Sequence, residues 1–117
     1  MPASIDISLV RKVTGDRPEK IIELLQLYRR SLLEDAARLA ALPRHPPTIT
    51  SKHRIAHRIA GAARTIGARH LVEACLRVRE SDHETIDHHV SMLQEQAEFI
   101  EMSVRATIAN LRRQMPQ

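Results

Sequence analysis

Apolar side chains recur at intervals of three and four residues through most of this chain, which is the spacing of one face of an α-helix. No stretch shows the sustained two-residue alternation that is typical of a half-buried strand. Aromatic residues, which strands favour, make up only 2% of the 117 residues. The pattern therefore predicts an all-α protein.

Prolines, glycines and cap-forming residues divide this pattern into helices. A short helix is expected over residues 5–13, where apolar residues lie on one side. Asp16 is the expected N-cap of a long helix that ends before Pro43. Thr50 or Ser51 is expected to cap the next one.

Two further breaks complete the expected organisation. A break at Gly67 separates either two helices or the halves of one kinked helix, and Ser81 or Asp82 is expected to cap the last helix. Long amphipathic helices with short connections favour an antiparallel four-helix bundle, here with a short additional N-terminal helix. We expect residues 1–117 to form a single helical-bundle domain.

Charge and composition exclude several kinds of protein. The 18 lysines and arginines outnumber the 14 acidic residues, which gives a net charge of +4 and suits an acidic or phosphorylated partner. No apolar run reaches the roughly 18–20 residues of a membrane span. We therefore expect a cytoplasmic protein, or a cytoplasmic module of a larger one, that makes no membrane contact.

The single cysteine excludes an internal disulfide and a cysteine-based zinc finger. Cys75 shares an apolar stripe with Leu71, Ala74 and Val78. This pattern predicts a small buried side chain and not a reactive thiol.

The candidate chemistry lies in residues 53–67. On a helical wheel that starts from Ile59, His57 lies about 160° away, Arg64 about 140° away and Gly61 about 160° away on the other side. The apolar face, within about 60° of Ile59, holds Ile55, Ala56, Ala62, Ala63 and Ile66. The wheel therefore predicts that His57 points into solvent.

Gly61 lies one turn after His57, in a segment that otherwise uses alanine freely. A glycine costs about 1 kcal/mol relative to alanine in a helix interior. Its missing side chain leaves room for another protein to approach the imidazole. Arg64 on the same side offers a cation for an anion held there. Together these features indicate a nucleophilic or phosphorylatable histidine.

At this point the chain resembles a known family. The run AHRIAGAARTIGA over residues 56–68, followed by Leu71, Cys75 and Glu80, is similar to the signature of histidine phosphotransfer (HPt) domains. These modules occur alone or at the C-terminus of hybrid sensor kinases. The motif covers about residues 56–80, and the helical organisation of the whole chain agrees with it.

The resemblance implies that His57 accepts a phosphoryl group from an aspartyl phosphate of a receiver domain and passes it to another receiver, such as a response regulator. The receiver would supply the aspartate and Mg²⁺, so this chain is expected to bind no cofactor or metal. The family often has lysine three positions after the histidine, where this chain has Ala60. Arg58 or Arg64 would then supply the cation, and the wheel favours Arg64.

The docking surface is expected to surround His57, with small residues at its centre and arginines at its rim. A receiver with an acidic active-site mouth suits such a surface. His53 either binds the phosphate or is simply exposed, and an exposed histidine is the more common case. The expected docking residues are His53, Arg54, Ala60, Gly61 and Ala68.

No P-loop or kinase glycine-rich loop is present in the sequence. We therefore expect that this chain cannot phosphorylate itself with ATP. We expect it to act as a monomer that contacts receiver domains and no nucleic acid.

Two alternatives to phosphotransfer follow from the same residues. His53 and His57 are spaced to share a metal ion, with His83, His88 or His89 as further ligands, but two histidines are only half a site. A nucleic-acid-binding helical bundle is compatible with the isoelectric point near 10. However, aromatic stacking residues are nearly absent.

Overall fold

The computed structural model describes residues 5–43 and 49–115, and all regular secondary structure in these ranges is helical. The all-α prediction is confirmed. The helices are α1 (Ile7–Thr14), α2 (Pro18–Ala41), α3 (Ile49–Thr65), α4 (Arg69–Arg79) and α5 (Ile86–Gln114).

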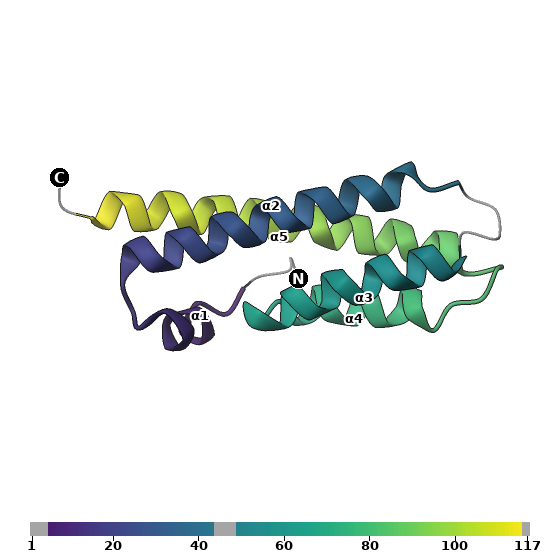
Figure 1. Cartoon of the computed structure of the whole chain (residues 1–117), viewed down its shortest axis with the longest axis horizontal. Helices are drawn as coiled ribbons and strands as arrows, with labels where there is room; N and C mark the ends of the chain where they lie inside the picture. The colour runs from purple at the N-terminus through teal and green to yellow at the C-terminus, as the bar shows by residue number, and fades with distance from the viewer. Residues whose placement is uncertain (1–4, 44–48, 116–117) are drawn as a thin grey trace.

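The four long helices form an elongated antiparallel bundle with principal extents of 52 × 22 × 21 Å. Each long helix packs against two others, in the cyclic order α2, α3, α4 and α5. Figure 1 shows α2 beside α5 in one layer and α3 beside α4 in the other, with α1 at the end of the bundle where α2 begins. The predicted four-helix bundle with a short N-terminal helix is therefore confirmed.

The predicted apolar stripes form a continuous core along the bundle. In α2 the stripe includes Leu25, Leu32 and Leu39, all nearly inaccessible to solvent. Burial of one such side chain contributes about 1.5–3 kcal/mol. The largest fully buried side chains are Ile21, Leu25, Ile59, Ile66, Leu71, Leu93 and Ile100. Among the described residues, none of the helices combines the length and apolarity needed to cross a bilayer.

The start of α2 differs from the prediction. Asp16 has a φ of 62° and pairs with Arg11 at 3.1 Å, so its carboxylate does not cap the helix. Arg17 occupies the N-cap position and Pro18 the first helical position, where a missing N–H costs nothing. Gly15 ends α1 in the left-handed conformation, and Asp16 continues this sharp turn.

The predicted caps of α3 are also wrong. This helix begins at Ile49, so Thr50 and Ser51 lie inside its first turn. The residues that precede Ile49 lie outside the described ranges.

The turn before α5 is organised by Asp82, one of the two predicted caps. Its Oδ1 accepts hydrogen bonds from the backbone N–H groups of Glu84 and Thr85 and from the Thr85 hydroxyl, each at 3.0 Å. These bonds, above all those from Thr85, lower the pKa of Asp82. Thr85 itself occupies the N-cap position of α5. Asp82 therefore shapes the approach to the helix without being its N-cap.

The break at Gly67 separates two helices. Gly67 has a φ of 66°, between the end of α3 and the start of α4. A Cβ at this position would lie 2.5 Å from the Cβ of Asp6. The backbone N–H of Asp6 donates to the Ile66 carbonyl at 2.8 Å, so Asp6, which directly precedes α1, packs on this turn. Asp6 also caps α1, through bonds from Ser8 and Leu9.

Gly67→Ala is expected to destabilise the protein by about 1–3 kcal/mol, because a side chain is strained at positive φ and would also collide with Asp6. Chemical denaturation of the variant and the parent protein measures this difference. Gly15→Ala is the matched comparison, since Gly15 has a φ of 75° but open space around its Cβ position. A smaller loss in Gly67→Ala than in Gly15→Ala would contradict the role given to the Asp6 contact.

Candidate functional site

His57 lies near the middle of α3 on its solvent-exposed side. Its neighbours Ile55, Ala56 and Ile59 are buried, as the helical wheel predicts. No hydrogen bond or ion pair to another described residue holds the imidazole. The ring is therefore accessible to a partner. A neutral imidazole is nucleophilic.

The surface one turn after His57 is open. Gly61 is exposed, and a Cβ built on it meets no atom within 4 Å outside its own helix turn. Packing within the bundle therefore gives no reason for a glycine here. The opening lies on the same side of α3 as the imidazole.

The two candidate cations have different surroundings. Arg58 lies 3.5 Å from the carboxylate of Asp35 on α2, which also accepts a hydrogen bond from Arg38 at 3.0 Å. Asp35 is almost completely buried, so it holds Arg58 toward α2. Arg64 is exposed in the last turn of α3 and has no acidic partner among the described residues. Of the two arginines, only Arg58 is held by a carboxylate among the described residues.

A comparison with protein families identifies this arrangement. The model of the Hpt domain matches residues 23–114, most of the chain. The chain belongs to the Hpt domain family. Hpt domains carry out histidine phosphotransfer in phosphorelays and interact with receiver domains. The sequence resemblance is confirmed and extends well beyond its motif.

Comparison of this Hpt domain with curated proteins and with solved structures found no match. The assignment to the family therefore depends on the family match and on the bundle itself.

Two predicted docking residues of the Hpt domain do not reach the surface. Ala60 and Ala68 are both fully buried, so the prediction that they form the small centre of an exposed patch is wrong. Ala60 lies about 100° from Ile59 on the wheel, and packing on both flanks of α3 buries a wider arc than the 60° used above. Ala68 belongs to the tight α3–α4 turn, where its N–H donates to the Ala63 carbonyl.

The other predicted docking residues lie at or near the surface. Arg54 and Gly61 are exposed. His53 is only half-buried, but its Nε2 is buried without a hydrogen-bond partner among the described residues. The expectation of a simply exposed His53 is therefore wrong for this atom.

Two charged side chains are buried although the sequence did not lead us to predict it. Lys52 is 3% exposed and donates to Asp87 of α5 at 3.1 Å, and Asp35 is also 3% exposed. A signal for both exists in the periodicity. Lys52 lies only about 20° from Ile59 on the wheel, and Asp35 continues the stripe of Leu32 and Leu39. These pairs join α3 to α5 and α3 to α2, and so fix the helix that carries His57.

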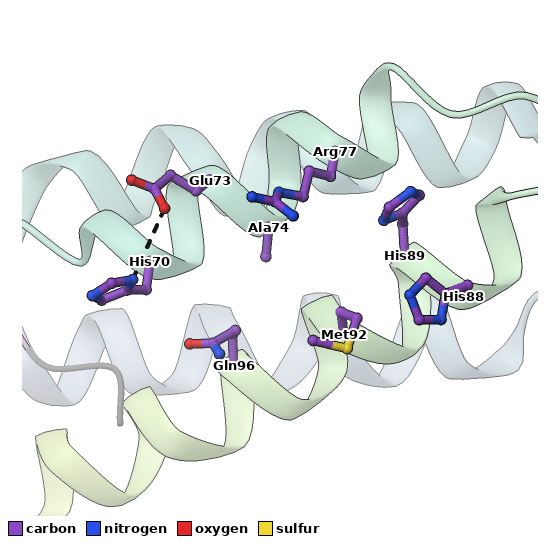
Figure 2. A pocket seen from close by; sticks show the side chains of 8 residues that line it. All are labelled: His70, Glu73, Ala74, Arg77, His88, His89, Met92 and Gln96. Carbon is purple, nitrogen blue, oxygen red and sulfur yellow. Dashed lines mark ion pairs between the residues drawn. The ribbon is translucent and has the colours of Figure 1, made fainter. Parts of the chain in front are cut away.

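The histidines do not assemble a metal site in the part of the chain that the structure describes, where no group of three or more suitable ligands is present. Figure 2 shows that His88 and His89 line a pocket between α4 and α5 together with His70. In that pocket His70 pairs with Glu73 at 3.9 Å. His53 and His57 are not among its lining residues. The metal alternative therefore gains no support from the geometry.

Cys75 lies in the core of the Hpt domain and is fully buried. Burial raises the pKa of its thiol to about 12, although the positive charges of Arg64 and Arg79 act in the opposite direction. The thiol stays protonated near neutral pH and is a poor nucleophile. The prediction of a buried cysteine is confirmed.

Proposed function

We propose that this Hpt domain accepts a phosphoryl group on His57 from the aspartyl phosphate of one receiver domain and passes it to the aspartate of another, in a cytoplasmic phosphorelay. The observation that carries the proposal is an accessible imidazole beside the open surface at Gly61. In the first step a ring nitrogen of His57 forms a bond to phosphorus as the bond between phosphorus and the donor aspartate oxygen breaks. In the second step the bond between nitrogen and phosphorus breaks as an oxygen of the acceptor aspartate forms its bond to phosphorus.

The division of labour between the two proteins follows from this chemistry. Phosphoryl transfer depends mainly on in-line positioning and on neutralisation of the charge on the phosphoryl oxygens. The Hpt domain supplies the nucleophile and one cation. The sequence between Lys52 and Leu71 contains no acidic residue, so no carboxylate from this segment repels the phosphate. The receiver supplies the aspartate and its Mg²⁺, so the Hpt domain needs no cofactor of its own.

The docking surface that we propose consists of Arg54, Gly61, Arg64 and the exposed edge of His53 around His57. Its positive charge suits the acidic active-site mouth of a receiver domain. We expect the Hpt domain to dock as a monomer.

The proposal is tested by incubating the Hpt domain with a phosphorylated receiver domain and Mg²⁺. A label that is lost in acid and kept in base identifies phosphohistidine. ATP alone, without a receiver, is expected to leave the Hpt domain unlabelled. Absence of label with a panel of phosphorylated receivers would contradict the proposal.

Arg64→Ala is expected to slow phosphoryl transfer by about ten- to a hundredfold. A hydrogen bond to a charged group contributes about 1.5–3 kcal/mol, and 1.4 kcal/mol corresponds to a factor of ten in rate. Rapid-quench measurement of transfer from a phosphorylated receiver gives the rate. Arg58→Ala is the matched comparison, because Asp35 holds Arg58 away toward α2. A greater slowing in Arg58→Ala than in Arg64→Ala would reverse the assignment of the cation.

A further inference from the structure

A second charged feature lies on the other layer of the bundle. A groove of about 620 Å³ runs between α2 and α5 and is lined by four arginines, Arg29, Arg30, Arg105 and Arg112. None of its lining residues is acidic, and Leu33, Ile108 and Ala109 add apolar side chains to the lining. We call this feature the arginine groove. Its volume falls within the range of small-ligand sites.

The positive charge of the arginine groove is poorly compensated. Glu101 on α5 lies 2.7 Å from Arg29 and 3.9 Å from Arg105, so one carboxylate serves two guanidinium groups. Arg30 and Arg112 have no acidic partner among the described residues. Four arginines from two packed helices therefore line one groove, and the nearby carboxylate of Glu101 pairs with only two of them. Like charges that line one groove repel one another, and a bound anion would reduce this repulsion.

The arginine groove is separate from the site at His57. It is built from α2 and α5, whereas His57, Gly61 and Arg64 are all carried by α3. Figure 1 shows α2 and α5 forming the layer opposite α3 and α4. A ligand in the groove would therefore leave the imidazole uncovered.

We propose that the arginine groove binds a small anion with several linked phosphate groups. Guanidinium groups form paired hydrogen bonds with phosphate oxygens, which favours phosphate over a simple halide. A single phosphate group engages only one or two guanidinium groups, whereas a chain of phosphates reaches arginines on both helices. The concave shape favours a small ligand over the flat surface of a protein partner.

Inorganic triphosphate is the probe for the test, in isothermal titration calorimetry at physiological ionic strength. We expect binding of one triphosphate per chain. The double variant Arg30→Gln with Arg112→Gln is expected to weaken binding at least tenfold. These two arginines have no acidic partner, so their replacement breaks no ion pair and is expected to leave thermal unfolding in buffer almost unchanged.

Controls separate specific binding from general charge attraction. Arg17→Gln with Arg79→Gln removes the same net charge at exposed positions outside the groove and is expected to keep the affinity of the parent protein. His57→Gln is expected to bind triphosphate unchanged, which separates this site from the phosphotransfer site.

Three outcomes would overturn the proposal. The first is no binding of triphosphate, and the second is equal weakening in the groove variant and in the control variant. The third is binding to vesicles that contain phosphatidylglycerol without binding of free triphosphate, which would assign the groove to a lipid surface. Loss of binding in the groove variant alone supports the proposal, whatever the result of the phosphotransfer assay.

Discussion

His57→Gln is expected to abolish phosphoryl transfer to the Hpt domain while leaving the bundle folded. Glutamine has no ring nitrogen with a free electron pair that attacks phosphorus, so no phosphohistidine forms. The side chain of His57 is exposed and makes no hydrogen bond to another described residue. Its replacement therefore changes the free energy of unfolding by less than about 0.5 kcal/mol.

The measurement compares the parent protein and the variant after incubation with the same phosphorylated receiver. His70→Gln is the matched control, since His70 is an exposed histidine on α4 and is expected to leave labelling intact. Circular dichroism during thermal unfolding checks that both variants are folded. Label retained by His57→Gln and lost by His70→Gln would move the phosphorylated residue to α4.

The position of His57 was predictable because it depends on the helix alone. The apolar side chains in the segment 53–67 define a buried face of the helix. His57 lies about 160° from the centre of this face, so it is exposed in any packing that buries the face. The same reasoning identified Gly61 and Arg64 on the exposed side, and both are exposed in the structure. The core stripes of α2 and α5 were predictable for the same reason.

Ala60 and Ala68 were not predictable from the wheel, because their burial depends on neighbouring helices. Alanine is common both inside and outside a bundle, so its identity does not indicate its environment. Packing of α2 and α4 against both flanks of α3 buries Ala60, and the α3–α4 turn buries Ala68. The docking surface that we propose is therefore narrower and more polar than the one predicted from the sequence.

The predicted N-caps of α2 and α3 were wrong for a related reason. Asp6 and Asp16 are both aspartates that precede a helical segment, yet only Asp6 caps its helix. Asp16 follows Gly15 in the left-handed conformation, which directs its carboxylate toward Arg11. Capping depends on the backbone conformation of the residue before the helix, and the packing of the preceding turn determines that conformation. The ion pair between Arg58 and Asp35 was not predictable either, because Asp35 lies on a different helix.

Gly61→Leu is expected to slow transfer from a phosphorylated receiver by a hundredfold or more while the protein stays folded. Long side chains on a helix lean toward its N-terminus, so a leucine at this position covers the turn that carries His57. A Cβ there meets no atom within 4 Å, so the bundle accommodates the first part of the new side chain. Leucine also favours helix over glycine, so stability is expected to be equal or higher.

Gly61→Ala separates two effects of replacing Gly61: blocked access of the receiver to His57 and a change in the stability of the helix. Alanine adds one methyl group in open space and is expected to stabilise the helix by about 1 kcal/mol. Its transfer rate is expected to stay within a few fold of the parent, because a methyl group does not reach the imidazole. Chemical denaturation and rapid-quench transfer assays on the two variants give both quantities.

Ala106→Leu completes the series, since Ala106 is an exposed small residue on α5, outside the surface around His57. It adds a leucine of the same size to the molecule and is expected to leave transfer unchanged. Transfer at the parent rate in Gly61→Leu would show that a receiver does not approach along this side of α3. In that case the glycine would need another explanation, since the bundle itself does not require it. A graded loss from glycine through alanine to leucine at position 61 would instead identify the access route, because the side-chain volume beside His57 increases along the series while the stability of the helix does not fall.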